Sequence, residues 1–434
     1  MTIQSPRRAG RLALGAVLLC VAGACASRAP RDGVEITFSG SALGAEGALL
    51  AKQIARFERI HPGIRVRVQP TPDDATQRHQ LFVQWLNAHA DDPDVLQLDV
   101  IWTAEFAAAG WIRPLVAYHP VTRDFFPATI EANSWNDTLY AIPWYADVGM
   151  LYFRSDLLPR APRSMDELMA VTEPARRERG GPSYGIVWQG ARYEGLVTVF
   201  LEYLGGFGGR IVDDDGRVVV DSPAGVRALS VMAEQLRSGR APREMVTWHE
   251  EEARFAFQNG DAILMRNWPY AYPLLADSAR SRVAGRVGVA VMPAAPGGSP
   301  TAALGGSELA INARSDAPDS AWALVAYLTA PAQMLERATV GGYFPTRPAL
   351  FDDPRLRAAL SIPADTARSI VAHSRPRPVT PIYSQLSDLL QIRLHRALTG
   401  QAAPAAALHD AARAMNALID RTRLRDRMAR RRAR

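Results

Sequence analysis

The chain of 434 residues has only two cysteines and a single lysine, and both shortages restrict what it can be. Cys20 and Cys25 lie near the N-terminus, so the rest of the chain has no cysteine for a disulfide or a cysteine-based metal site. Because Lys52 is the only lysine, the abundant arginine indicates codon bias rather than a phosphate-binding surface. Walker A, HExxH and GxSxG patterns are also missing, and we expect neither a cofactor nor a metal.

Positive charge is concentrated at the two ends of the chain. The first 24 residues carry three arginines and no acid, and residues 421–434 carry eight arginines and one acid. The net charge is +6, so the body between these ends is mildly acidic and lacks the basic footprint of a nucleic-acid-binding protein. We expect the basic tail, residues 421–434, to be a solvated helix end, with contact to anionic lipid headgroups as the alternative.

The first 24 residues have the layout of a signal peptide. A basic start is followed by an apolar run over residues 12–21, which is far shorter than the roughly 20 residues of a membrane-spanning helix. Small residues then precede Cys25, as in the signals of lipoproteins, where the cysteine is acylated and becomes the mature N-terminus. Ordinary cleavage after Ala24 or Ala26 is the alternative. Either way, we expect an exported protein, periplasmic or anchored at the cell surface.

The chain as a whole is 48% hydrophobic and 22% charged, which is the composition of a soluble globular protein, and it is long enough for two domains. Alternating or buried apolar residues predict strands at 34–38, 64–68 and 93–102, and helical spacing predicts a helix over 46–60. Strand, helix and strand in this order predict a parallel α/β sheet.

Similar signals continue along the chain. Ser164 and Glu167 form a predicted capping box after a strand at 150–153, and Ser222-Pro223 begins a second helix. Strands are expected at 287–291 and 309–311, and the chain from Leu356 onward reads as mainly helical.

Several long motifs carry a family resemblance. These are ARFERIHPGIRVRV, DVLQLDVIWTAEFAAAGWIRPL, WYADVGMLYFRSDLL, WQGARYEGL, FQNGDAILMRNWPYAY, ALGGSELAIN and RPVTPIYSQLSDLLQ. Together, and in this order over nearly the whole mature chain, they resemble the family 1 extracellular solute-binding proteins, the receptors of ABC importers, and within it the trehalose/maltose-binding branch.

The resemblance implies an α/β type II periplasmic-binding fold, with two discontinuous lobes joined by hinge segments around a ligand cleft. On this sequence the N-terminal lobe is expected from 25–142 and 300–355, and the C-terminal lobe from 143–299 and 356–420. The crossings are expected near 141–145, 296–305 and 351–363, where prolines and glycines interrupt regular pairing.

A sugar site needs carboxylate acceptors, guanidinium or amide donors and aromatic platforms. Asp99 stands in an otherwise apolar strand, where an acid is costly unless it reaches the strand end. The resemblance places it at the cleft, and a helix-capping role is the alternative. Glu46 follows a strand-to-helix turn where the family uses an acid, although stabilisation by the helix dipole explains it almost equally well.

Three further candidates come from the resemblance. Tyr145 and Asp147 follow the first expected crossing, where the family places an aromatic residue beside a ligand-binding acid. Glu250 belongs to a run of acids, which is usually a solvated face. The resemblance makes a place for Glu250 in the binding site an equal alternative.

Trp268 is the candidate stacking platform, because Pro269 interrupts the chain directly after it and exposes it at a loop; a core position is the alternative. Arg377 precedes Pro378, which disfavours helix and lets an extended arm reach over the cleft. Its guanidinium can donate two parallel hydrogen bonds to neighbouring hydroxyls.

Gly305 and Gly306 belong to the expected binding segment, and Ser307 departs from the branch, which commonly has tryptophan there. A missing platform leaves room for a different or larger ligand than trehalose.

The resemblance therefore predicts a non-enzymatic, monomeric receptor that binds a neutral di- or oligosaccharide and passes it to the permease subunits of an ABC transporter. An exported carbohydrate-active enzyme is the alternative, since carboxylates around a sugar also describe a glycosidase.

Overall fold

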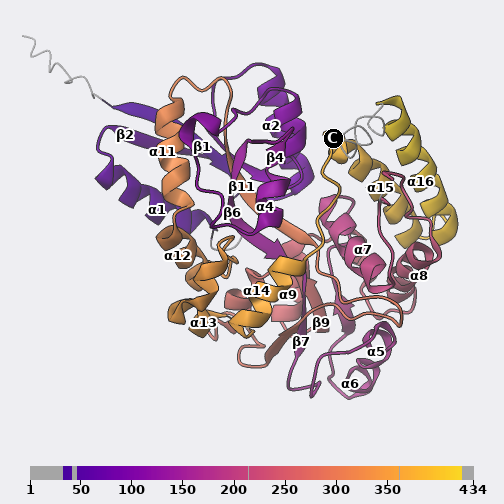
Figure 1. The fold of residues 1–434 in the computed structure, drawn as a ribbon. Coiled ribbons are helices and arrows are strands. Elements are labelled where there is room, and N and C mark those ends of the chain that lie inside the picture. The colour runs from indigo at the N-terminus through magenta and orange to yellow at the C-terminus, as the bar shows by residue number, and fades with distance from the viewer. Residues whose placement is uncertain (1–32, 42–45, 214, 361, 423–434) are drawn as a thin grey trace, which may run out of the picture.

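The computed structural model describes residues 33–41, 46–213, 215–360 and 362–422. Cys25, the signal peptide and residues 423–434 of the basic tail lie outside these ranges. The described chain forms two α/β lobes, each built around its own sheet (Figure 1).

The first lobe contains a five-stranded sheet in the order β2-β1-β3-β11-β6. Its strands are β1 (Val34–Gly40), β2 (Ile64–Pro70), β3 (Val95–Asp99), β6 (Ala141–Val148) and β11 (Leu304–Ile311). β1 is parallel to β2 and β3, but β11 is antiparallel to β3 and β6. The expected parallel sheet is thus limited to three strands, because β11 returns from the second lobe and enters from the opposite end.

Helices cover this sheet. They are α1 (Glu46–Ile60), α2 (Ala75–Asn87), α3 (Thr103–Ala108), α4 (Pro127–Ala132), α11 (Pro318–Leu328) and α12 (Pro331–Gly341), and a short hairpin of β4 (Ser134–Trp135) and β5 (Thr138–Leu139) lies beside α3. The helix expected over 46–60 is confirmed at both ends. It buries Leu50, Ile54 and Phe57, and His61 follows it at the turn into β2.

The second lobe contains a four-stranded sheet in the order β10-β7-β9-β8. Its strands are β7 (Met150–Arg154), β8 (Tyr184–Val187), β9 (Ala262–Asn267) and β10 (Val287–Ala290). Its helices are α5 (Met165–Ala170), α6 (Glu173–Arg177), α7 (Glu194–Gly206), α8 (Pro223–Arg237), α9 (Glu250–Gln258) and α10 (Ala271–Ala276). The C-terminal helices α15 (Tyr383–Leu398) and α16 (Pro404–Arg421) pack on α7 and α8 (Figure 1).

The chain crosses between the sheets at three places. β6 stays in the first sheet to Val148, so the first crossing is at Gly149, beyond the expected boundary at 142/143. The second lies between the end of β10 at Ala290 and the start of β11 at Leu304, a stretch that overlaps the expected 296–305. A third segment runs beside the second, since Arg375 forms a bridge with Ala303, and it lies beyond the expected 351–363, which is largely helical. The helices α13 (Pro354–Ala359) and α14 (Ala364–His373) precede this third segment.

One local prediction is only half correct. The Ser164 hydroxyl accepts from the Glu167 backbone N–H, as the capping box requires. The Glu167 carboxylate, however, accepts from the Arg163 N–H and pairs with Arg160 instead of returning to the Ser164 backbone. The Arg160 guanidinium offers this carboxylate charged donors, which bind it more strongly than a neutral amide.

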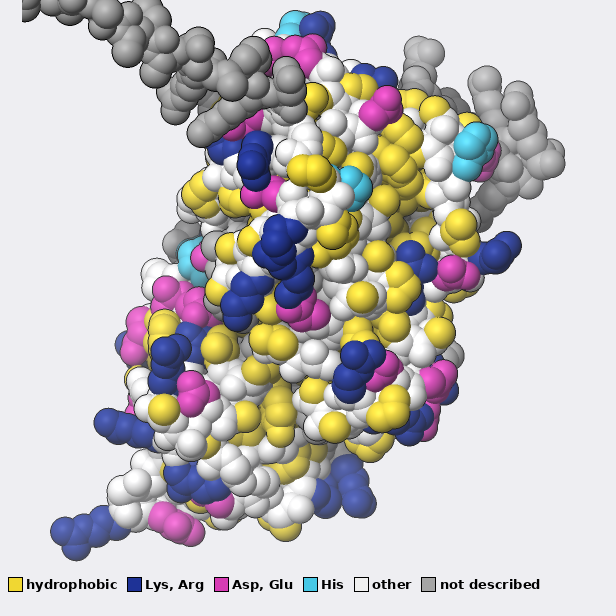
Figure 2. Space-filling model, turned by 90° about the vertical axis from the view of Figure 1, so that its left-hand side faces the viewer, with side chains coloured by type: hydrophobic (Ala, Val, Ile, Leu, Met, Phe, Trp, Pro, Cys, Tyr) yellow, Lys and Arg dark blue, Asp and Glu magenta, His cyan; other side chains and the backbone are white. Residues whose placement is uncertain are grey.

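On the face of the molecule in Figure 2, positive and negative side chains of the described residues are interspersed. This distribution agrees with the absence of a basic footprint in the body of the sequence. Within the described ranges, no helix is long and apolar enough to cross a membrane.

Candidate functional site

A small cavity lies where the two sheets face each other. Its volume is about 90 Å³, room for about three water molecules. Eight of the nine predicted ligand-binding residues line it: Asp99, Tyr145, Asp147, Glu250, Trp268, Gly305, Gly306 and Arg377. Segments up to 278 residues apart, from Asp99 to Arg377, are thus brought together.

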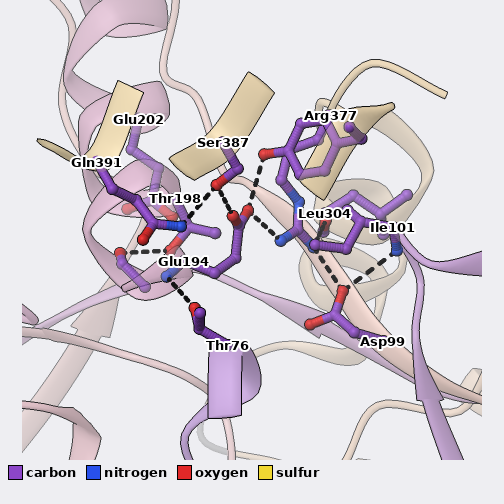
Figure 3. A network of polar contacts seen from close by, with 12 residues as sticks. Thr76, Asp99, Ile101, Glu194, Thr198, Glu202, Leu304, Arg377, Ser387 and Gln391 are labelled. Carbon is purple, nitrogen blue, oxygen red and sulfur yellow. Dashed lines mark hydrogen bonds and ion pairs between the residues drawn. The ribbon is translucent and has the colours of Figure 1, made fainter. Parts of the chain in front are cut away.

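Arg377 joins carboxylates from the two lobes (Figure 3). Its Nη1 donates to Glu194 Oε1 at 2.8 Å and its Nη2 to Asp99 Oδ1 at 3.2 Å. The Arg377 side chain is 2% exposed, and burial alone would lower its pKa, but Asp99 and Glu194 raise that pKa above the usual value. The expected pair of donors to sugar hydroxyls is therefore engaged by protein carboxylates in this conformation.

Glu194 is a site residue that sequence reasoning missed. It opens α7, a wholly buried helix, and its carboxylate accepts from Tyr383 Oη at 2.8 Å and from the Ser387 hydroxyl, both on α15. The sequence signal that could have identified Glu194 is an acid at the start of a largely apolar helix. Because both oxygens of Glu194 have donors, its charge is well compensated.

Asp147 lies at the end of β6 and is half-buried, with no hydrogen-bond partner for Oδ1 within the described residues. Burial raises its pKa to about 8, and the neighbouring charges of Glu46 and Asp99 add to the rise. A buried oxygen without a partner is costly, so Asp147 is poised to bond with a polar ligand.

Ser307 fills the position at which the branch commonly has tryptophan. Its hydroxyl donates to Tyr145 Oη at 2.9 Å and accepts from Gln97 Nε2 at 2.9 Å. A small polar network therefore occupies this wall of the cavity. Gly306, at φ 142°, lets the chain approach Tyr145, since a Cβ there would lie 2.5 Å from the Tyr145 carbonyl oxygen.

Trp268 follows β9 and is half-buried at the cavity, as a platform requires. Its indole Nε1 donates to Glu250 Oε1 at 3.3 Å. Glu250 is the first residue of α9, and burial raises its pKa, so it is part of the cavity wall rather than of a solvated face. A Cβ on Gly305 would lie 3.3 Å from the indole, so glycine keeps this approach open.

Glu46 is the predicted residue that the structure does not place on the cavity wall. It is 1% exposed and pairs with Arg337 at 2.9 Å, and it accepts from the Ser41 hydroxyl at 2.7 Å. Both oxygens are therefore engaged one layer behind the cavity, where Ser41 is the residue that lines it. Sequence reasoning could not show this, because Arg337 arrives from α12, 291 residues along the chain.

Polar contacts between the lobes also surround the cavity. His249 Nε2, before α9, lies 2.9 Å from Asp74 Oδ2, before α2. On the side of α15, Ser384 donates to Glu105 Oε2 at 2.5 Å and lies 3.1 Å from His79 Nε2. This second contact lines a larger interlobe cavity of about 600 Å³ between α2 and α15. The lobes are thus in contact on both sides of the candidate site.

The described residues contain no cluster of three or more histidine, cysteine or acidic side chains arranged to hold a metal ion. The site therefore offers carboxylates, one guanidinium, hydroxyls and an indole as its chemistry. This set matches ligands with many hydroxyl groups and an apolar face.

Comparisons with known proteins agree with this fold. The chain is 36% identical over 404 residues to a probable ABC transporter-binding protein of Deinococcus radiodurans, covering 90% of this chain and 94% of that one. Its fold matches the maltose-bound MalE3 protein of T. maritima with a TM-score of 0.85 and 40% identity, covering 89% of this chain and 100% of that one. An ABC transporter solute-binding protein from Agrobacterium radiobacter in complex with ribitol matches with a TM-score of 0.80 and 25% identity, covering 90% and 100%.

The family model for bacterial extracellular solute-binding proteins matches residues 41–335, which include β11 and most of the cavity wall. Together with the fold and the interlobe cavity, this match shows that the chain belongs to the bacterial extracellular solute-binding protein family.

Proposed function

We propose that this protein is the substrate-binding component of an ABC sugar importer, which binds a neutral di- or oligosaccharide of the trehalose/maltose kind between its lobes. The convergence of Asp99, Asp147 and Trp268 on one interlobe cavity carries the proposal. Maltose in the structure of the T. maritima relative supports the substrate class. The bound sugar is handed to permease subunits in the membrane.

The chemistry of the wall supports a neutral sugar. The carboxylates of Asp99 and Asp147 accept from hydroxyls, and the Trp268 indole offers an apolar face to the C–H groups of a sugar ring. A ligand with a carboxylate of its own would add a further negative charge beside these acids and Glu250, which is unfavourable.

We further propose that the two lobes move about the three crossing segments as a monomer. In place of the sequence-based boundary at 142/143, the first lobe would end at Val148 and the second would begin at Met150. The helices α15 and α16 would move with the second lobe, because they pack on α7 and α8. Size-exclusion chromatography with light scattering tests the monomer.

Calorimetry with maltose and trehalose tests the binding function. Micromolar affinity, about −8 kcal/mol, is expected for at least one sugar of this class. Trp268→Ala should reduce that affinity at least tenfold, since a buried stacking face is lost. Trp322→Ala is the matched control, because Trp322 stacks on Tyr118 away from the cavity. Equal affinities in the two variants would remove Trp268 from the site.

Export follows from the family, and the lipid anchor is a separate proposal. We propose that Cys25 is acylated and tethers the receptor beside its permease. A Cys25→Ser protein should then move from the membrane fraction to the soluble exported fraction. A wild-type protein already soluble in that fraction would rule the anchor out.

For the enzymatic alternative, one cluster has the residue types of a hydrolytic triad: Ser384, His79 and Glu105. In a hydrolytic triad the serine bonds to one histidine nitrogen and the acid to the other. Here the Ser384 hydroxyl donates to Glu105, and His79 uses Nε2 for both neighbours. This arrangement does not activate the serine, so we propose a receptor without hydrolytic activity. Hydrolysis of a disaccharide that disappears with Asp99→Asn would show the opposite.

A further inference from the structure

A buried guanidinium lies against the candidate platform. Arg266, in β9, has a fully buried side chain, and its Cζ lies 3.9 Å from the centroid of the Trp268 ring. A Cβ built on Gly305 would lie 3.3 Å from the same ring. The indole is therefore confined by the guanidinium, by Gly305 and by its hydrogen bond to Glu250.

The guanidinium itself is held in one orientation. Its Nε and Nη2 donate to the two oxygens of Glu202 at 2.9 and 2.5 Å, and its Nη1 donates to Gln189 Oε1 at 3.0 Å. Glu202 is fully buried on α7, two helical turns beyond Glu194 (Figure 3). A bidentate pair with a third partner leaves the planar guanidinium little freedom to rotate.

The same ion pair touches two of the crossing segments. Glu202 Oε1 accepts from the Ala303 N–H at 3.3 Å, and the Gly149 N–H donates to the Ala303 carbonyl at 3.3 Å. A Cβ on Gly149 would lie only 1.6 Å from Glu202 Oε1, so only glycine fits against the pair. The platform and the crossings thus share one buried charged cluster.

We propose that Arg266 is a positioning residue that holds the Trp268 indole for the ligand and, through Glu202, ties this platform to the crossings at Gly149 and Ala303. The inference rests on the proposed function for its consequence in sugar binding. Its structural part, the placement of the indole, can be tested without any ligand.

The ligand-free test follows the indole N–H resonance of Trp268, assigned as the signal absent from Trp268→Phe. The double variant Glu202→Gln/Arg266→Met removes both buried charges together, which avoids leaving one charge unpaired. The resonance should shift or broaden in this variant and, to a smaller extent, in the milder Gln189→Met. Arg154→Met is the control, since Arg154 ends the neighbouring strand β7 and pairs with Asp156 in the turn that follows it. An unchanged resonance in both test variants would overturn the proposal.

The binding test is a double-mutant cycle with maltose as the probe. The double variant should bind maltose at least about tenfold more weakly than wild type, while the same changes in a Trp268→Ala background should cost less than about twofold. Equal losses in both backgrounds would show that the pair does not act through Trp268. If wild type binds no sugar, the proposed function fails while the resonance test still decides the positioning role.

The link to the crossings is tested with glycine substitutions. Gly149→Ala must displace Glu202 and should disturb the Trp268 resonance in the same direction as the double variant. Gly63→Ala is the control, because a Cβ at Gly63 meets nothing within 4 Å. A Trp268 resonance that is the same in Gly149→Ala and wild type would overturn the connection to the crossings.

Discussion

The surroundings of Asp147 favour binding of a ligand at the cost of stability in the ligand-free protein. Its Oδ1 has no partner among the described residues, and its pKa is raised to about 8 by burial and by the charges of Glu46 and Asp99. Its contribution to stability is fully present below the unfolded value of 3.8 and is lost as the pH rises toward about 8. At neutral pH the group is therefore destabilising until something donates a hydrogen bond to it.

Asp147→Asn should consequently stabilise the ligand-free protein and weaken sugar binding. The gain in the free energy of unfolding is expected to be about 2–4 kcal/mol near pH 7 and to shrink toward pH 3, because the wild-type carboxyl is then mostly neutral in both states. Affinity near pH 9, where the wild-type carboxyl is charged, should fall about tenfold because that charged acceptor is lost. Denaturation at both pH values and calorimetry measure these effects, with the exposed Asp166→Asn as control. A variant less stable than wild type at neutral pH would contradict the argument.

The sequence indicated residues that line the cavity where the residue type was unusual for its place. Asp99 in an apolar strand and Trp268 before a proline both lie at the cavity. Glu46 and Glu194 were harder to judge, because their roles depend on Arg337 and Arg377, which arrive from more than 180 residues away. Such pairings are set by the tertiary fold and leave no local pattern in the sequence.

At the scale of elements, α1 and α12 are joined by two ion pairs of different kinds. Glu46 and Arg337 are each 1% exposed, and the Arg337 guanidinium lies 3.7 Å from the Trp144 ring centroid. Arg56 and Glu336 form the second pair at the surface, with Arg56 39% exposed. The same two helices therefore offer a direct comparison of a buried and an exposed pair.

Arg337→Met should lower the free energy of unfolding by about 3–5 kcal/mol, because it leaves the buried Glu46 carboxylate without its partner. Arg56→Met, the matched control, should cost less than about 1 kcal/mol. The double variant Glu46→Gln/Arg337→Met should recover most of the loss, since no unpaired charge remains. Urea denaturation of the three variants checks this order. Equal losses for Arg337→Met and Arg56→Met would show that burial does not determine how much stability is lost when the ion pair is broken.

Element boundaries were predictable where breakers end a periodic run, as for α1 before His61-Pro62-Gly63 and for α8 after Ser222. Strand direction was not. β11 reads locally like any buried strand, and its antiparallel position between β3 and β6 follows only from the path of the chain through the second lobe. The continuation of β6 past Pro143 likewise depends on pairing with β11.

At the scale of the whole molecule, we expect the His249–Asp74 contact to make the proposed closure of the lobes sensitive to pH. The Asp74 carboxylate raises the pKa of His249, and Glu250 and Glu252 act in the same direction against partial burial, while the Tyr193 ring packs on the imidazole. The contact is strongest below the ordinary histidine value of 6.5 and weakens as the pH rises through the raised pKa. This contact favours a higher sugar affinity near pH 6 than near pH 9, while the titration of Asp147 near pH 8 acts in the opposite direction. The contribution of His249 to the pH dependence of affinity is therefore the difference between wild type and His249→Gln.

His249→Gln should reduce that pH dependence of affinity, while His409→Gln, at an exposed pair with Asp221, should leave it unchanged. Calorimetry of the three proteins at both pH values measures the difference. The same pH dependence in His249→Gln as in wild type would assign it to another group of the cavity.

The size of the cavity makes the last prediction, that the lobes must part to admit a ligand and close around it. About 90 Å³ is well below the roughly 300 Å³ or more of a typical small-molecule pocket, so a disaccharide cannot enter the described conformation. Asp99 belongs to the first lobe and Trp268 and Glu194 to the second, so a ligand that contacts all three binds most fully when the cleft is shut. Only such a difference in affinity shifts the open and closed populations, and a change from 1:99 to 99:1 needs about 5.5 kcal/mol, within the total binding free energy of a micromolar ligand.

Small-angle X-ray scattering should show a smaller radius of gyration at saturating sugar than without it. Asp74→Asn weakens a contact between the lobes, so the radius of gyration of this variant without sugar should be larger than that of wild type without sugar. An identical radius with and without a sugar that calorimetry shows to bind would mean that the lobes do not close on the ligand.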